Sequence, residues 1–304
     1  MKDVALVLSS GGARGLAHIG VIEELEAQGY RITSIAGCSM GALIGGFHAA
    51  GKLPEFREWM KGIDRRRMLE LTDFSLSLTH IVKGVRIIDA MKEILPDVNI
   101  EDLPIPYCAV STDWESGEEV VFRTGSLYDA IRASISLPTF FSPVQRNGRI
   151  LIDGGVINPL PLNRVDRHKG DILMGVDVSG HDYKAQSKLQ RMAQNKRKND
   201  RSISGKIFNK LIPDNIEFNY VTLLSRTSSL MIRQNSRLMT QLMNPDVMVD
   251  IQMRRYGGFD YDKSEKIIEI GRAKTQKVLS DPKIVKKLSE KSSSKNLFKW
   301  LKKK

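Results

Sequence analysis

Near its N-terminus the chain repeats one pattern twice: a short apolar segment runs into a glycine-containing turn, and a helical pattern follows. The apolar segments are residues 4–8 and 32–36, and the turns after them are residues 10–15 and 37–41. Strand and helix in alternation are typical of a parallel sheet with crossover helices. The sequence therefore predicts an α/β fold with a central, mostly parallel sheet flanked by helices.

Later segments fit the same fold class. Ser126 and Asp129 form an S-x-x-D capping box, which predicts the start of a helix. Asp153-Gly154-Gly155 follows a further apolar segment and marks the end of a strand. The remaining predictions are strands over 106–112, 118–123, 149–152, 171–178 and 247–251, and helices over 227–243 and 262–279.

Basic residues are concentrated in two segments. The net charge is +12, but residues 184–210 and 283–304 each hold nine Lys or Arg and one acidic residue, which leaves −4 for the rest. Strands and helices are predicted on both sides of the first segment. We therefore expect one domain over 1–282, with a motif-bearing core at 4–178 and a basic insertion at 184–210. A basic tail, amphipathic or disordered, then occupies 283–304.

Composition excludes several classes of protein. The 304 residues contain no apolar run near the roughly 20 residues of a membrane-spanning helix. The N-terminus lacks the pattern of a signal peptide, and two cysteines exclude a disulfide framework or a cysteine-rich zinc site. We expect a cytoplasmic protein without a metal or organic cofactor.

Gly37-Cys38-Ser39-Met40-Gly41 is a G-x-S-x-G sequence placed between a predicted strand and a predicted helix. A nucleophilic serine at such a sharp turn needs flanking glycines for close backbone approach. The alternative is that Ser39 is an ordinary helix N-cap. Cys38, which precedes the turn residue, is expected to point into the core.

Ser10-Gly11-Gly12-Ala13-Arg14-Gly15 joins the first strand to the first helix. Backbone N–H groups at a helix N-terminus can stabilise the oxyanion that develops in acyl transfer. Dinucleotide binding is the competing hypothesis. Two features argue against it: Ser10 replaces the first glycine of that fingerprint, and the second strand does not end in an acidic residue.

Asp153 is the candidate base for Ser39. A carboxylate at a strand end, with glycines beside it, can take the serine proton if burial or hydrogen bonding tunes it. The alternative is a simple Asx turn. For a triad, His168 or His181 would be the partner, whereas His48 lies too far along its helix and His18 falls on an apolar helix face. The triad is poorly supported.

Taken together, these motifs resemble the patatin-like phospholipase family. The resemblance is carried, in order and spacing, by residues 8–15, 37–41, 133–144 and 153–155, and it covers about residues 4–178. Residues 246–250, 259–261 and the closing helix resemble the end of bacterial members more loosely. Ser10 departs from the family pattern, which usually has glycine there. If that position needs a positive φ, Ser10 is strained.

The resemblance implies a Ser39–Asp153 dyad without a third residue, acting on carboxylic esters of lipids as a phospholipase A or lysophospholipase does. It also implies an oxyanion hole formed by backbone N–H groups of Gly11, Gly12 and either Ala13 or Arg14. Gly15, Gly37, Gly41, Gly154 and Gly155 complete the motifs.

The basic segments suggest partners. If residues 295–304 are helical, Phe298, Trp300 and Leu301 lie together with Leu297 opposite the lysines, as in segments that bind a membrane surface. The alternative is a solvated, disordered tail. We expect a lipid substrate and peripheral membrane association through the basic segments, and we do not expect nucleic acid as a partner. The alternative function is a non-catalytic protein that binds membranes or polyanions on the same fold.

Overall fold

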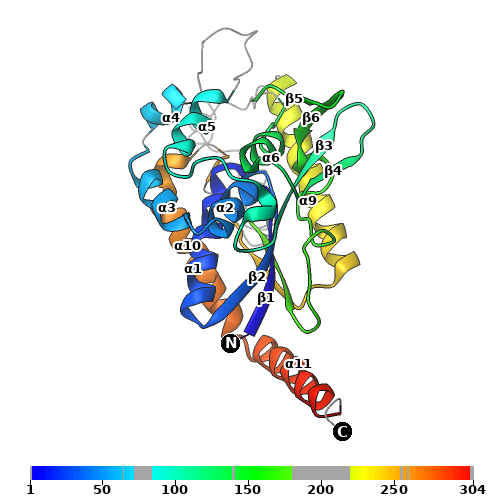
Figure 1. The fold of residues 1–304 in the computed structure, drawn as a ribbon. Helices are drawn as coiled ribbons and strands as arrows, with labels where there is room; N and C mark the ends of the chain where they lie inside the picture. Colours follow the sequence, from blue (N-terminus) through cyan, green and yellow to red (C-terminus); the bar gives the residue numbers. More distant parts are fainter. Residues whose placement is uncertain are drawn as a thin grey trace, which may run out of the picture.

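A computed structural model describes residues 2–63, 65–71, 84–138, 141–179, 220–253, 256–258 and 260–301. The predicted insertion at 184–210 lies outside these residues, and so its bounds and those of the domain and tail stay predictions. Within the described part, the chain forms a sheet with helices on both faces (Figure 1). The predicted α/β fold with a central sheet flanked by helices is therefore confirmed.

The sheet contains eight strands in the order β5-β6-β3-β2-β1-β7-β8, with β4 pairing with β3 off this path. Neighbours from β3 to β8 along this path are parallel, whereas β4, β5 and β6 pair in antiparallel fashion. The strands are β1 (Lys2–Leu8), β2 (Tyr30–Cys38), β3 (Tyr107–Asp113), β4 (Glu119–Phe122), β5 (Val144–Arg146), β6 (Arg149–Asp153), β7 (Ile172–Asp177) and β8 (Val247–Asp250).

The helices are short near the N-terminus and longer near the C-terminus. The α-helices are α1 (Ala17–Ala27), α2 (Met40–Ala49), α3 (Leu53–Lys61), α4 (Arg65–Leu71), α5 (Val85–Lys92), α6 (Leu127–Ser134), α9 (Tyr220–Met243), α10 (Ser264–Leu279) and α11 (Pro282–Leu301). Single 3-10 turns are η1 (Gly12–Leu16), η2 (Ile100–Asp102), η3 (Gly154–Val156) and η4 (Tyr261–Lys263).

Strand β1 is buried on both faces, as its continuous apolar sequence predicts. Leu6 and Leu8 belong to the larger core cluster, which also includes side chains of α1, α2 and α10. Ala5 and Val7 belong to a second cluster, against which Met239 and Met243 of α9 pack. Helix α9 therefore covers the sheet face opposite α1, α2 and α10 (Figure 1).

Helix α11 begins at the amino-terminal edge of the parallel strands. Lys291 contacts the Asp246 carboxylate and donates to the Asp171 carbonyl at 2.9 Å, and these residues immediately precede β8 and β7. Leu288 is buried in the larger core cluster. Residues 298, 300 and 301, predicted to contact a membrane, lie at the helical end of α11. Their side chains lie outside the described part.

Candidate active site

Ser39 stands in the turn between β2 and α2, in a backbone conformation that L-residues rarely adopt. Its φ of 54° and ψ of −121° make it one of three non-glycine residues with positive φ in the described part of the chain. A Cβ atom at Gly37 would lie 2.5 Å from the Gly41 carbonyl oxygen, and one at Gly41 would lie 2.3 Å from that of Leu8. The flanking glycines therefore permit the sharp turn, and the strain falls on Ser39.

Strand β3 brings Ser39 and Asp153 together. Cys38, the last residue of β2, pairs with Val110, and Asp153, the last residue of β6, pairs with the next residue, Ser111. The ends of two strands that lie far apart in sequence therefore meet on successive residues of β3. The Ser39 hydroxyl donates to Asp153 Oδ2 at 2.6 Å.

Both alternatives considered from the sequence are answered by this geometry. Ser39 occupies the N-cap position of α2, but its side chain makes no capping hydrogen bond. Asp153 does form an Asx turn, since its Oδ1 accepts from the Gly155 amide at 2.7 Å. The same carboxylate uses its other oxygen for Ser39.

Burial tunes the Asp153 carboxyl group. Desolvation disfavours the charged form and raises its pKa to about 6 from an ordinary 3.8. The hydrogen bonds from Ser39, Gly155 and Cys38 lower the pKa, but their effect is smaller. A carboxylate with this pKa is ionised at neutral pH and basic enough to accept a proton. The Cys38 thiol is fully buried, with Sγ 3.9 Å from Asp153 Oδ1, and burial raises its pKa well above the ordinary value. Cys38 therefore stays protonated and points into the core, as predicted.

Ser134, at the end of α6, fixes the backbone of the turn. Its hydroxyl accepts from the Ser39 amide at 2.8 Å and donates to the Val110 carbonyl at 2.7 Å. Sequence analysis included Ser134 in a family motif but gave it no role. The side chain connects the strained turn to β3, on which the dyad is assembled.

The glycine-rich loop presents two backbone amides at the start of η1. Gly11 and Gly12 are partly exposed, and their N–H groups have no hydrogen-bond acceptor within the described residues. The Ala13 amide, by contrast, donates to the Gly258 carbonyl at 2.8 Å. Of the predicted oxyanion donors, Gly11 and Gly12 therefore remain available, whereas the amide of Ala13 is occupied.

The positive φ expected in this loop falls on Gly12, at 56°, and not on Ser10. The condition under which Ser10 would be strained, a positive φ, is therefore not met, and serine is tolerated at that position because its backbone conformation is ordinary. A Cβ atom at Gly12 would lie only 2.7 Å from the Gly258 carbonyl oxygen. Gly258, which lies between β8 and α10, was not singled out from the sequence. Its carbonyl anchors the loop by accepting from the Ala13 amide.

Residues 6–166 match the family described as patatin-like phospholipase, which is more than half of the 304 residues. The chain belongs to the patatin-like phospholipase family. The resemblance inferred from the sequence motifs is confirmed.

Similar proteins occur within and beyond bacteria. An uncharacterized NTE family protein of Mycobacterium tuberculosis is 49% identical over 177 residues, covering 58% of this chain and 49% of the relative. Neuropathy target esterase of Drosophila melanogaster is 31% identical over 188 residues, covering 60% of this chain and 13% of the relative. The chain thus spans about half the length of the mycobacterial relative. Among solved structures, VipD from Legionella pneumophila aligns with a TM-score of 0.47 and 15% identity, covering 91% of this chain and 66% of that one.

In this family member none of the described histidines is hydrogen-bonded to Ser39 or Asp153. His18 is buried, donates through Nε2 to the Ser9 carbonyl at 2.9 Å, and burial lowers its pKa to about 4. His48 is buried at the far end of α2, and burial lowers its pKa to about 4 as well. His168 is exposed beside Asp171, and residue 181 lies outside the described part. Among the described residues, the hydroxyl of Ser39 is thus paired with a carboxylate alone.

A charge cluster beside the glycine-rich loop was missed from the sequence. Asp177, the last residue of β7, is half-buried, and desolvation raises its pKa despite the opposing effects of its hydrogen bonds with Ser179 and of the positive charges of Arg14 and Arg233. Arg14 comes from η1 and Arg233 from α9. Charges from three elements therefore interact at this site.

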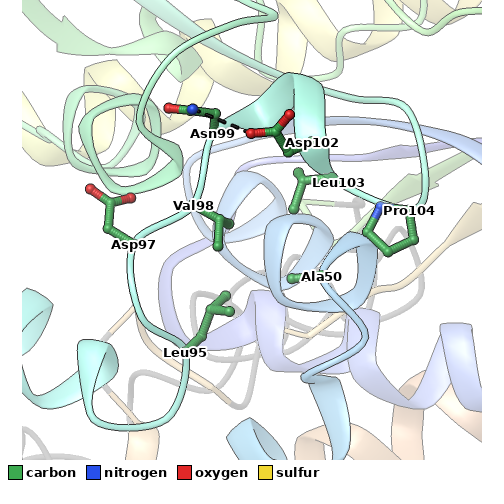
Figure 2. A pocket seen from close by; sticks show the side chains of 8 residues that line it. All are labelled: Ala50, Leu95, Asp97, Val98, Asn99, Asp102, Leu103 and Pro104. Carbon is green, nitrogen blue, oxygen red and sulfur yellow. Dashed lines mark hydrogen bonds between the residues drawn. The ribbon is translucent and has the colours of Figure 1, made fainter.

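A separate depression of about 470 Å³ lies at the opposite end of α2 from Ser39 (Figure 2). Its acidic side chains have local partners, since Asp97 accepts from the Ser126 hydroxyl at 2.7 Å and Asp102 accepts from Asn99 at 3.3 Å. The residues that line it include no hydroxyl or thiol nucleophile.

Across the described ranges, no group of three or more His, Cys, Asp or Glu side chains is arranged to hold a metal ion. None of the helices in the same ranges combines the length and the apolar character that crossing a bilayer requires.

Proposed function

We propose that this chain is a serine acyl hydrolase that cleaves carboxylic esters of lipids with Ser39 as nucleophile and Asp153 as general base. The observation that carries the proposal is the 2.6 Å hydrogen bond from the Ser39 hydroxyl to Asp153 Oδ2. Ser39 is only partly buried, so an ester can reach it, whereas Asp153 is almost fully buried. A reachable nucleophile paired with a desolvated base is the arrangement that covalent catalysis requires.

Acylation is the first step. Ser39 Oγ bonds to the ester carbonyl carbon while its proton passes to Asp153, and negative charge develops on the carbonyl oxygen. The N–H groups of Gly11 and Gly12 donate to that oxygen. When the carbonyl re-forms, the alcohol portion of the lipid leaves and takes the proton from Asp153.

Deacylation reverses the proton path. A water molecule gives a proton to Asp153 and bonds through its oxygen to the acyl carbon. The second tetrahedral intermediate collapses, the carboxylic acid is released, and the proton returns to Ser39 Oγ. Each step needs only the residues named here, and Asp153 alternates between base and acid.

The substrate class is a proposal based on the family and its named relatives. The family is described as phospholipases, and the Drosophila melanogaster relative is named an esterase. We assign phospholipase A or lysophospholipase activity on this basis. The basic segments at 184–210 and 283–304, with Phe298, Trp300 and Leu301, are proposed to hold the protein on an anionic membrane.

Release of fatty acid from vesicles of phosphatidylcholine and phosphatidylglycerol, and from the corresponding lysophospholipids, tests this function. Wild type is expected to release fatty acid, and Ser39→Ala is expected to lose at least about a thousandfold in rate. Equal release by the Ser39→Ala variant would overturn the proposed nucleophile. No release from either lipid class by folded wild type would overturn the substrate assignment.

A further inference from the structure

Helix α9 carries most of the exposed large hydrophobic side chains of the described part. Leu230, Met231, Leu238 and Leu242 are 50%, 52%, 51% and 76% exposed, and only Trp114 and Val285 outside α9 belong to the same class. A contiguous apolar surface on a water-facing helix marks an interaction site.

These four side chains form one stripe. Met231, Leu238 and Leu242 are seven and four residues apart, which places them on one face of a helix, and Leu230 lies next to Met231. From residue 230 to 242 the stripe is about 18 Å long. Buried Ser236 and the packed Met239 and Met243 lie on another side of α9, so the exposed stripe is a second apolar face of this helix.

The stripe lies beside the loop that carries the catalytic acid. Asn235 of α9 donates to the Val156 carbonyl at 3.2 Å, in the 3-10 turn that follows Asp153. An open groove of about 550 Å³ is bounded on one side by Ile157 and on the other by α9, including Leu238 and Leu242. The apolar surface therefore lies beside the turn that follows Asp153.

The charged residues of α9 indicate which kind of partner the stripe binds. Over its 24 residues α9 contains Arg226, Arg233 and Arg237 and no acidic residue. An isologous contact with a second copy would bring the same arginines together, which disfavours self-association through this face. Apolar side chains with exposed Arg237 beside them, on a helix without an acidic residue, match a bilayer surface with anionic head groups.

We infer that the α9 stripe, defined as Leu230, Met231, Leu238 and Leu242, is a docking surface for an anionic lipid bilayer that holds the Ser39 site against its substrate. The inference rests on the proposed lipid substrate. The stripe adds a membrane contact that is separate from the basic tail. Helix α11 begins at the amino-terminal edge of the sheet, whereas Ser39 and Gly11 follow the carboxyl ends of β2 and β1. The α9 stripe, and not the tail, is therefore the apolar surface beside the turn that follows Asp153.

The test is cosedimentation with vesicles made of equal parts phosphatidylcholine and phosphatidylglycerol. It is performed in the Ser39→Ala background so that binding is measured without turnover. The triple variant Met231→Gln, Leu238→Gln, Leu242→Gln is expected to lower the partition coefficient at least about tenfold. The matched control, Trp114→Gln, removes exposed apolar area between β3 and β4, outside both α9 and the basic tail, and is expected to stay within about twofold.

Hydrolysis of p-nitrophenyl butyrate, a water-soluble ester, separates docking from catalysis. The triple variant with Ser39 intact is expected to keep kcat/KM on this ester within about twofold, which also shows that it folds. Unchanged vesicle binding by the triple variant, or no vesicle binding without the substitutions, would overturn the docking surface. A change in oligomeric state with unchanged vesicle binding would assign the stripe to a second copy. Failure of the unsubstituted protein to hydrolyse any ester would instead overturn the proposed function.

Discussion

The Asp153 carboxylate divides its two oxygens between the nucleophile and its own turn. Oδ2 accepts from the Ser39 hydroxyl at 2.6 Å, and Oδ1 accepts from the Gly155 amide at 2.7 Å. The Gly155 bond fixes the carboxylate plane, so Oδ2 is held toward Ser39 without help from a third side chain. A Cβ atom at Gly155 would lie 2.9 Å from Oδ1, which explains glycine at that position.

The raised pKa of Asp153 predicts the pH dependence of activity. The general base must be ionised, and its pKa in the free protein is about 6. We expect kcat/KM for a neutral ester to rise with pH, to pass half of its maximum near pH 6, and to level off above it. A pH profile with p-nitrophenyl butyrate checks this. A half-maximum near the ordinary carboxyl value of 3.8 would contradict the burial argument.

The same pKa predicts that ionised Asp153 destabilises the fold. Because the folded pKa of about 6 exceeds the ordinary 3.8, the folded state binds the proton more tightly than the unfolded chain. The free energy of unfolding therefore falls as pH rises through this window, by about 3 kcal/mol in full.

Asp153→Asn removes this titration. Between about pH 4 and pH 8, wild type is expected to lose about 3 kcal/mol in free energy of unfolding relative to the variant. Urea denaturation of both proteins at the two pH values measures the difference. If the free energy of unfolding depended on pH equally in the two proteins, burial would not destabilise the ionised form of Asp153.

Ser134→Ala is expected to loosen the nucleophile turn. The substitution leaves the Ser39 amide and the Val110 carbonyl without their partner, which costs about 1–3 kcal/mol in stability, and we expect kcat to fall about tenfold. Ser126→Ala is the matched control, because it removes the N-cap of the same helix at its other end. The control is expected to lose about 1 kcal/mol and to keep its kcat. Equal effects on kcat would mean that Ser134 acts through stability alone.

Gly12→Ala tests the oxyanion loop. The added Cβ would meet the Gly258 carbonyl oxygen at 2.7 Å, at a backbone φ of 56°. Displacing the Gly11 and Gly12 amides is expected to lower kcat about 10²–10³-fold. Gly29→Ala has a similar positive φ of 77° and nothing within 4 Å, so it reproduces the backbone strain without the clash. If both variants lost activity equally, the loop would not be the source of the effect.

Cys38→Ala tests whether the thiol takes part. Cys38 is buried, and its pKa is raised well above the ordinary value, so no thiolate forms near neutral pH. We expect the variant to keep kcat within about threefold and to lose about 1–2 kcal/mol in stability from the cavity. Loss of activity comparable to Ser39→Ala would identify Cys38 as the nucleophile.

Ser39 and Asp153 could be singled out from the sequence because each lies at or just after the end of a strand, in a turn with glycines close by, and these signals are local. Their pairing as a dyad was implied by the family resemblance. The same local signals located seven of the eight described strands closely, but they missed β5 (Val144–Arg146), and α9 begins at Tyr220 and not at 227 as predicted. The contacts of Ser134 with Ser39 and of Gly258 with Ala13 join distant segments. Such contacts depend on sheet register and helix packing, for which a single sequence has no local signal.

That Ser10 escapes strain could not be predicted for a related reason. A family pattern shows which residue type is usual at a position, but not which residue of a loop takes the left-handed conformation. Here Gly12 takes it, and Ser10 is held in ordinary backbone by its amide, which donates to the Pro159 carbonyl at 2.9 Å. The convergence of Arg14 and Arg233 on Asp177 was unpredictable for the same reason, since α9 reaches the loop only in the folded sheet.

Labelling with a fluorophosphonate probe tests the central claim, an activated Ser39, most directly. Wild type is expected to be labelled, Ser39→Ala to show no labelling, and Asp153→Asn to react at least about a hundredfold more slowly. The probe needs no knowledge of the lipid substrate, so its result does not depend on the substrate class or on membrane docking. Absence of labelling in folded wild type with vesicles present, or labelling that persists in Ser39→Ala, would contradict the account.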